Sequence, residues 1–469
     1  MNSPEMQNLQ QTATISGALA TFVADFENGQ MPEAVSERAK LLMLDAIGIA
    51  FASTRYEFAQ CALAALSDLG GGDSEVIGME PKLELRNAIL LNGILVHGLD
   101  YDDTHLPGQS HLTASCVPTA LALGAHKRAS GRDMLIACAL GLETGARIGT
   151  AANGGFLRAG FHATSMVGTF ASTLLAGRLL KMTAPQLTLA QGIALSMTAG
   201  TIQPIAEGSW TKRMHPGWAA AASVTATALA RQGYIGPAEA YEGRYGLYRQ
   251  FMGEHFNDAE PGQVIAGLGE RWEFPRASIK LYPACHQVHA FFNAALKLSQ
   301  THALKPAEIK SIRTRVASAA VPLVCEPLAA KRVPTTSYAA QFSLPYGLAC
   351  CLTRGKFSLE EIEESAYSDP ALLALAQKVD YEIDPDSGFP KFRTGEVIIH
   401  TTDGRTLTQR ESLLPDEPAP AAAIIEKFMA NVEGVIPAAR AQEVRDTILN
   451  LEEVADCRAL TTMLRGSQS

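Results

Sequence analysis

The sequence has no excess of positive charge. Across 469 residues it carries 39 Lys and Arg against 48 Asp and Glu, a formal net charge of −9 with His neutral. Proteins that bind nucleic acid or an anionic membrane surface need a basic face, so this balance argues against both partners. A small anionic ligand remains compatible with it, provided that a few cations gather at one place.

Cysteine is sparse and lacks the spacing of a metal or disulfide motif. None of the eight Cys forms a C-x-x-C pair, and most of them lie in apolar stretches. This usage is typical of a reduced, cytoplasmic protein and not of a disulfide framework or a zinc ribbon.

The sequence also lacks a secretory signal and a membrane span. No Lys or Arg precedes the apolar stretch 15–23. The longest uncharged run, 182–206, is interrupted by Pro185, Pro204 and several Gln, so we expect buried helices there. We therefore predict a cytoplasmic protein with no membrane partner.

What the first 274 residues do contain is helical periodicity. Apolar and small residues recur at helical spacing, with few charges, in the segments 113–125, 133–148, 164–180, 187–199 and 218–231. Helices that are apolar on most faces pack in an interior, so the pattern predicts a large all-helical domain. The same composition suits an extensive dimer interface.

The pattern changes after Phe274. Alternation predicts strands at 312–316 and 379–383, and a hairpin joins 396–402 to 405–409 across Asp403-Gly404. Helical spacing is predicted for 338–353 and 359–365, and it returns near the end of the chain at 422–431, 438–451 and 454–464. We therefore predict a mainly α protein with an α+β insertion. Its large helical domain comprises 1–274 and 411–469, and its smaller α+β lid domain comprises 275–410.

An unusual concentration of Asp and His lies between residues 97 and 111. It reads His97-Gly98-Leu99-Asp100-Tyr101-Asp102-Asp103-Thr104-His105, with His111 beyond. Such side chains suit a divalent metal site. Alternatively, a carboxylate such as Asp100 orients a nearby His or Lys while His111 contacts an anionic substrate. The third interpretation is a capped polar loop after a helix, without any chemistry.

Three later segments place further basic side chains beside apolar ones. His162 precedes Thr164, which is a potential helix cap, and a helix N-terminus attracts carboxylates. Lys212 borders an apolar core, where a cation needs an anionic partner such as Asp100 or a bound carboxylate. Lys280 lies where the helical region ends, and clefts form at domain junctions. It can pair with a carboxylate or, with its pKa lowered by burial, act as a base. A purely structural role is the alternative for each of the three.

Taken in order, these segments resemble the MmgE/PrpD family over nearly the whole chain. The matching stretches are Asn92-Gly93, His97 to Thr104, Gly141-Leu142-Glu143, Arg147-Ile148-Gly149, Gly160 to Thr164, Thr211-Lys212, His215-Pro216-Gly217, Lys280 to Cys285, His289 and Phe342 to Tyr346. The resemblance implies a large helical domain with a smaller α+β lid, a homodimer, and no metal or organic cofactor. It also implies small polycarboxylate substrates. By motif matching, it implies catalytic roles for His162, Lys280, Asp100 and Lys212, and substrate-binding roles for His111, Thr104 and Tyr346.

The chemistry implied by the resemblance begins with an anion next to a carboxylate. Such an anion needs a base and a concentrated positive field. We predict a cofactor-independent dehydratase of a hydroxy-polycarboxylate similar to 2-methylcitrate. Cys285 stands where the decarboxylase-like members of the family carry His, which favours dehydration. The alternatives at the same site are an epimerase of a substituted succinate similar to iminodisuccinate and a decarboxylase of the cis-aconitate type. From another class, the alternative is a metal-dependent hydrolase that uses the loop 97–111.

Overall fold

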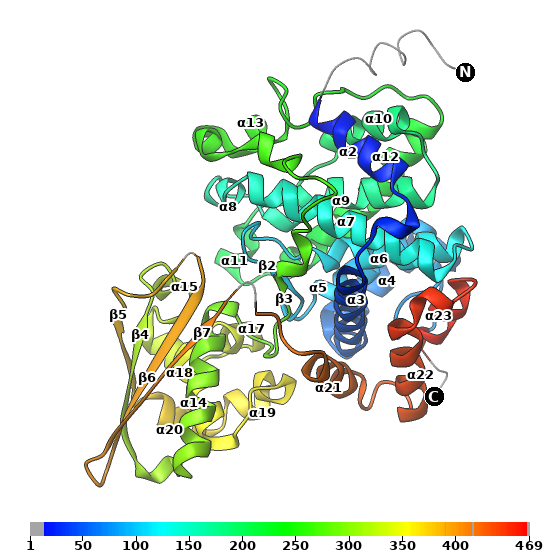
Figure 1. Cartoon of the computed structure of the whole chain (residues 1–469). Helices are drawn as coiled ribbons and strands as arrows, with labels where there is room; N and C mark the ends of the chain where they lie inside the picture. The colour runs from blue at the N-terminus through cyan, green and yellow to red at the C-terminus, as the bar shows by residue number, and fades with distance from the viewer. Residues whose placement is uncertain (1–13, 390, 415–416, 467–469) are drawn as a thin grey trace. The chain divides into compact units, whose positions relative to one another are not determined.

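The computed structural model describes residues 14–389, 391–414 and 417–466. The chain forms two compact units. Figure 1 colours their helices and strands by residue number, from blue near the N-terminus to red near the C-terminus. Unit 1 consists of Met1–Ile279 with Ala419–Ser469, and unit 2 consists of Lys280–Pro418. Unit 1 is helical and unit 2 contains the larger sheet, so the predicted fold class is confirmed. The sequence placed the boundaries slightly earlier, at 274 and 410.

Unit 1 is built around long helices that are buried on most of their faces. Small residues permit this close packing: nearly every residue of α7 and α9 is buried, including all of their Gly and Ala. The principal helices are α2 (Ile15–Asp25), α3 (Glu33–Ser53), α4 (Glu57–Asp68), α5 (Leu85–His97), α6 (Thr113–His126), α7 (Gly131–Ala151), α9 (Ala163–Leu179), α10 (Ala184–Leu195), α12 (Thr211–Arg231), α21 (Ala421–Val432), α22 (Ala438–Leu449) and α23 (Arg458–Met463).

Several helix boundaries of unit 1 differ from the prediction, most clearly those of α12 and α10. Helix α12 begins at Thr211 and not at Trp218, because it continues through Pro216. This proline removes one hydrogen bond of the second turn, and its ring crowds the carbonyl group of Lys212. Helix α10 ends at Leu195, earlier than predicted. The predicted helical domain is confirmed, and it also contains short strands that the sequence did not indicate, including β1 (Gly71–Ser74). Strand β2 (Thr104–His105) pairs antiparallel with β3 (Ala277–Ser278), and this ladder anchors the loop that follows α5.

Unit 2 is a four-stranded sheet in the order β5-β4-β6-β7. Strand β4 (Ile309–Val316) runs parallel to β5 (Val379–Ile383) and antiparallel to β6 (Arg393–Thr401), which pairs with β7 (Thr406–Leu413). These four strands confirm the predicted ones. The predicted hairpin turn is present, and Gly404 adopts φ 90°, a conformation that favours glycine.

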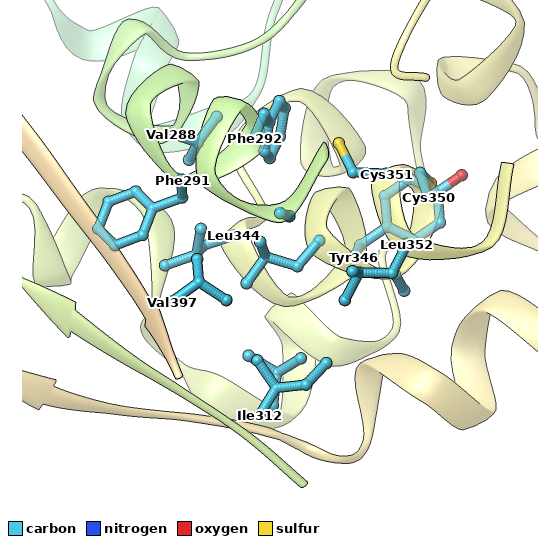
Figure 2. Packing of buried hydrophobic residues seen from close by; sticks show 14 of the residues in the cluster. Val288, Phe291, Phe292, Ile312, Leu344, Tyr346, Cys350, Cys351, Leu352 and Val397 are labelled. Atoms are coloured by element: carbon cyan, nitrogen blue, oxygen red, sulfur yellow. The ribbon is translucent and has the colours of Figure 1, made fainter. Parts of the chain in front are cut away.

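Helices α14 (His289–His302) and α18 (Leu344–Arg354) cover the core of unit 2. Figure 2 shows Phe291 and Phe292 packed near Leu344, with Val397 and Ile312 contributed by the sheet. The single helix predicted at 338–353 is two helices, α17 (Ser337–Gln341) and α18. The break occurs because the Ser343 hydroxyl caps the start of α18, where Pro345 occupies the first turn.

All eight cysteines are free thiols, as their spacing predicts. In the described part of the chain, no helix has both the length and the apolar content needed to cross a bilayer.

Candidate active site

The candidate site lies in unit 1, where the end of α5, the following loop and the starts of α9 and α12 come together. Two glycines allow α5 and α12 to approach at this point: a Cβ on Gly93 would lie 2.4 Å from Gly217 Cα, and one on Gly217 would lie 2.2 Å from Leu90 O. The loop then turns sharply at Asp100, whose φ of 50° is left-handed. These constraints bring side chains that are far apart in the sequence to one place.

His97, the last residue of α5, is fixed by a carboxylate. Its Nδ1 lies 2.8 Å from Asp102 Oδ2, and both side chains are buried. Its other ring nitrogen, Nε2, is buried and has no hydrogen-bond partner among the described residues. Buried polar atoms are normally paired, so this nitrogen points to a place for a water molecule or a ligand.

Asp103 caps the start of the neighbouring helix, α6. Its carboxylate accepts hydrogen bonds from the backbone N–H groups of Leu112 and Thr113 and from the Thr113 hydroxyl, at the start of α6. Burial, together with the nearby charge of Asp102, raises the pKa of Asp103 to about 7, although the bonds from Thr113 act in the opposite direction. Asp103 therefore supports the loop and does not face a substrate.

Two more imidazoles lie beside His97. The ring centroid of His111 lies 4.8 Å and that of His162 lies 5.5 Å from the centroid of His97. His111 Nδ1 is 2.7 Å from the carbonyl oxygen of Asp103, and its backbone N–H donates to Thr164 Oγ1. Thr164 is therefore not the cap that the sequence predicted; His162 itself occupies the N-cap position of α9.

His162 is held in its neutral form. Burial lowers the pKa of His162 well below its usual value, and the charges of His97 and Lys212 act in the same direction. Its Nδ1 lies 3.1 Å from Nδ1 of His215 on α12, whose pKa burial lowers to about 4. At neutral pH these two neutral rings share one hydrogen bond, so a proton gained by one ring has a direct route to the other.

Lys212 supplies the positive charge of the cluster. Its Nζ lies 3.1 Å from Asp100 Oδ1, and both side chains are about nine-tenths buried. The neighbouring Arg213 donates to the carbonyl oxygen of Gly98 at 2.6 Å and thus ties α12 to the loop. The sequence placed Lys212 before a helix; it lies in the first turn of α12. Its predicted pairing with Asp100 is present.

The remaining predicted residues are placed differently. Thr104 begins β2, and its buried Oγ1 has no hydrogen-bond partner in the part of the chain that the structure describes. Lys280 and Tyr346 belong to unit 2. Figure 2 shows Tyr346 within the apolar cluster of that unit, and its hydroxyl donates to Glu361 O at 2.6 Å. We therefore leave Tyr346 out of the proposed site; its substrate contact and the role of Lys280 stay predictions.

Sequence reasoning did not include His97, Asp102 and His215 among the site residues. His97 and Asp102 stood in the Asp/His-rich stretch, but the stretch did not show which carboxylate faces which ring. His215 precedes Pro216, and this position suggested a loop. The signal that was available is helical spacing: Lys212 and His215 are three residues apart and thus share one face of α12.

Two groups of side chains in the described residues are close enough to hold a metal ion. They are His97, His111 and His162, and Asp100, Asp102 and His111, with candidate ligand atoms within 4.8 Å of one another. The loop 97–111 contributes to both groups, as the metal interpretation of the sequence requires. The pairing of Asp100 with Lys212 favours the first group, because that carboxylate is already engaged by a cation.

Comparisons with known proteins agree over both units. The family model described as the MmgE/PrpD N-terminal domain matches residues 17–259, and the one described as the MmgE/PrpD C-terminal domain matches 282–453. The chain is 29% identical to a cis-aconitate decarboxylase of Aspergillus terreus, over 96% of each chain. It is 26% identical to a cis-aconitate decarboxylase-like protein of Aspergillus oryzae, over 96% of this chain and 97% of that protein. It is also 26% identical to the cis-aconitate decarboxylase of Homo sapiens, over 97% and 95%.

Proposed function

The chain belongs to the MmgE/PrpD family, and from this premise we propose that it is a lyase of a small polycarboxylate that works without a metal or an organic cofactor. The observation that carries the proposal is the cluster in unit 1. It unites a Lys212–Asp100 ion pair with three imidazoles, and the buried Nε2 atom of His97 has no hydrogen-bond partner among the described residues.

The substrate class follows from the charge of the cluster. A polycarboxylate needs cationic and hydrogen-bonding groups that compensate its charge away from bulk water. Lys212 provides a fixed cation, and His111 shares a group of close side chains with Asp100, the partner of Lys212. Thr104 is a further proposed contact, as the family resemblance implies. Asp100 holds the ammonium group of Lys212 in place through one carboxylate oxygen. An ammonium group has three N–H donors, so this contact does not use all of them.

As the reaction, we propose decarboxylation of a substrate similar to cis-aconitate, because the relatives reported above carry that name. In such a step the bond between carbon and one carboxylate breaks and CO2 leaves. The electron pair spreads toward the remaining carboxylates, and carbon then takes one proton. The local positive field stabilises the anion while its charge develops.

His162 is the proposed proton carrier. In the substrate-free protein its ring is neutral; the negative charges of a bound polycarboxylate favour the protonated ring, which then gives its proton to carbon, and His215 lies at hydrogen-bond distance behind it. Proton transfer by a positioned side chain contributes about 10²–10⁴-fold to a rate. Lys280 is the second proposed participant, through its place in the family motif.

Dehydration is the second candidate, and the family resemblance described above favours it through Cys285. A dehydratase uses the same cluster differently: a base takes the α-proton and an acid protonates the departing hydroxyl group. Both reactions pass through an anion stabilised by the same cations.

A panel of substrates tests the proposal. The protein is incubated with cis-aconitate, 2-methylcitrate, citrate and an aminosuccinate-type acid, and products are followed by NMR. Release of CO2 from cis-aconitate supports decarboxylation, and a new alkene from a hydroxy acid supports dehydration. Inversion at carbon without net conversion indicates an epimerase. Turnover of none of these acids, or turnover abolished by EDTA and restored by a divalent ion, contradicts the proposal.

A homodimer is the proposed assembly, in line with the family resemblance. Trp210, Met214 and Trp218 recur every four residues at the start of α12, and all three are exposed, by 45%, 39% and 43%. Large apolar side chains that share one exposed helix face mark a protein–protein contact.

A further inference from the structure

We propose that His97, His111 and His162 form a zinc-binding site, and that zinc bound there inhibits the enzyme. The binding of zinc is a property of the three imidazoles alone. Its inhibitory consequence rests on the proposed function, because the same rings are assigned there to substrate binding and proton transfer.

The three rings have the spacing of ligands around one ion. Their centroids are 4.8, 5.5 and 6.2 Å apart, and their candidate ligand atoms lie within 4.8 Å of one another. Three imidazoles bound tetrahedrally to zinc, at Zn–N distances of about 2.0–2.1 Å, have centroids about 5 Å apart. Small side-chain rotations therefore suffice to bring the nitrogens together.

Each ring is oriented through its Nδ1 atom by a second group. His97 Nδ1 faces the carboxylate of Asp102, His111 Nδ1 faces the carbonyl oxygen of Asp103, and His162 Nδ1 faces His215. Histidines that bind zinc typically use one ring nitrogen for the metal and donate the other N–H to a carboxylate or a carbonyl oxygen. When Nδ1 carries the proton, the lone pair is on Nε2, the nitrogen that binds the ion.

The Nε2 atom of His97 is the independent sign of a ligand. His97 is 1% exposed, and this nitrogen has no hydrogen-bond partner among the described residues. Asp102 engages the other nitrogen of the ring, and the ring centroids of His111 and His162 lie 4.8 and 5.5 Å from that of His97. A buried lone pair with no donor beside it is compensated when a cation binds.

The electrostatic surroundings permit a divalent cation. His162 is buried beside the other two rings, and the neutral imidazole is the form that binds a metal ion. Lys212 opposes the ion, but its ammonium is paired with Asp100, and the carboxylate of Asp102 adds a negative charge directly behind His97. Three protein ligands leave the fourth position of a tetrahedral ion open for water or for a carboxylate.

Metal titration tests the site without any substrate. The full-length protein is stripped with a chelator and titrated with Zn²⁺ by calorimetry and with Co²⁺ by visible absorption. We expect one ion per chain with micromolar or tighter affinity, and cobalt bands of tetrahedral nitrogen coordination. His97→Asn and His162→Asn should each weaken zinc binding at least tenfold, while His126→Asn, a change at an exposed His of unit 1, should leave it unchanged. Circular dichroism checks that the variants fold.

The result that overturns the inference is an absence of tetrahedral cobalt bands in the unmodified protein, or zinc affinity that His97→Asn and His162→Asn leave intact. An activity assay separates this inference from the proposed function. With both correct, zinc slows turnover and EDTA restores it. Zinc that binds as expected but raises turnover refutes the inhibitory role and the metal-free mechanism together. Turnover of a polycarboxylate without any zinc binding refutes only the inference.

Discussion

At the scale of single residues, the candidate site combines one fixed cation with rings that are held neutral. Lys212 forms an ion pair with Asp100, whereas burial holds His162 and His215 in the neutral form. This division suits a carbanion-forming reaction, because one group binds negative charge and others move protons. The overall charge of −9 makes the local cation more important, since the rest of the surface repels an anionic substrate.

The first prediction concerns Lys212. Lys212→Met should lower kcat/KM about 10–100-fold, because a hydrogen bond to a charged group contributes about 1.5–3 kcal/mol. Lys127→Met, the same change at an exposed Lys of unit 1, should stay within about twofold because exposed charges contribute about 0–1 kcal/mol. Steady-state kinetics on the identified substrate gives both values.

A double variant separates the role of Lys212 in the reaction from its role in the fold. Lys212→Met leaves the buried Asp100 without its cation, and thermal unfolding should show lower stability. Lys212→Met with Asp100→Asn should recover stability but not activity. Recovery of activity in the double variant would show that Lys212 has only a structural role.

The second prediction is a dependence of stability on pH through Asp103. The pKa of Asp103 is about 7 in the fold and about 3.9 in an unfolded chain. Between those values the folded chain holds a proton that the unfolded chain has lost, so the contribution of Asp103 is present below about pH 4 and is lost as pH rises through 7. Asp103→Asn should therefore gain stability relative to the unmodified protein by up to about 4 kcal/mol over this range.

Chemical unfolding at several pH values measures this difference. The matched control is Asp73→Asn, at an exposed carboxylate of the same unit, which should show no such trend. A constant difference between Asp103→Asn and the unmodified protein from pH 4 to 8 would show that Asp103 is not perturbed.

At the scale of elements, the site depends on how closely α5 approaches α12. The contact between Gly93 and Gly217 has no room for a methyl group, because the Cβ positions would lie 2.2–2.4 Å from backbone atoms of the facing helix. Backbone atoms cannot yield as a flexible side chain can. The helices must separate if either glycine is replaced, and the distance between His97 and Lys212 changes with them.

The third prediction follows from this contact. Gly217→Ala should destabilise the protein by about 1–3 kcal/mol through overpacking, and it should lower activity as well. Gly262→Ala is the control, because its Cβ would meet nothing within 4 Å. Thermal unfolding and kinetics measure both effects. Unchanged stability in Gly217→Ala would show that the two helices do not define the site.

The sequence predicted those elements whose local signals are strong. The hairpin at Asp403-Gly404 was predictable because a turn needs glycine where φ is positive, and strand β4 shows its alternation directly. The start of α12 was missed because Pro216 reads as a helix boundary, although a proline within the first turns of a helix is tolerated when the helix is packed on its neighbours.

The site itself was only partly predictable. The ion pair of Lys212 with Asp100 was foreseen because a cation next to an apolar core needs an anion. The contacts of His97 with Asp102 and of His162 with His215 were not, since they depend on where the loop turns and how α9 meets α12. Such contacts between distant segments leave no periodic signal in one sequence.

At the scale of the whole molecule, both ends of the chain contribute to unit 1. The ammonium group of Lys427, on helix α21, donates to the carbonyl oxygen of Tyr101 at 2.9 Å. The same Nζ atom lies 2.6 Å from Asp45 Oδ1 on α3. The loop that carries Asp100 is thus supported by a residue that follows unit 2 in the sequence. Unit 2 is therefore an insertion in the sequence of unit 1, whose last helices follow it.

The fourth prediction concerns assembly. If the exposed face of Trp210, Met214 and Trp218 is a dimer contact, then Trp218→Glu should convert a dimer into a monomer, because a charge placed in an apolar interface must lose its hydration. Leu69→Glu, a change at an isolated and strongly exposed leucine, should leave the dimer intact. Light scattering coupled to size-exclusion chromatography measures the mass. A monomeric unmodified protein would contradict the proposed dimer.

The most direct test of the central claim is the reaction with cis-aconitate in deuterated water after treatment with EDTA. We expect release of CO2 and one deuterium on carbon in each product molecule, at a rate that EDTA does not lower. We also expect that His162→Asn reduces this rate at least about 100-fold, the scale of a general acid–base contribution. Deuterium at carbon that depends on an added metal ion, or a His162→Asn variant as fast as the unmodified protein, would contradict the account.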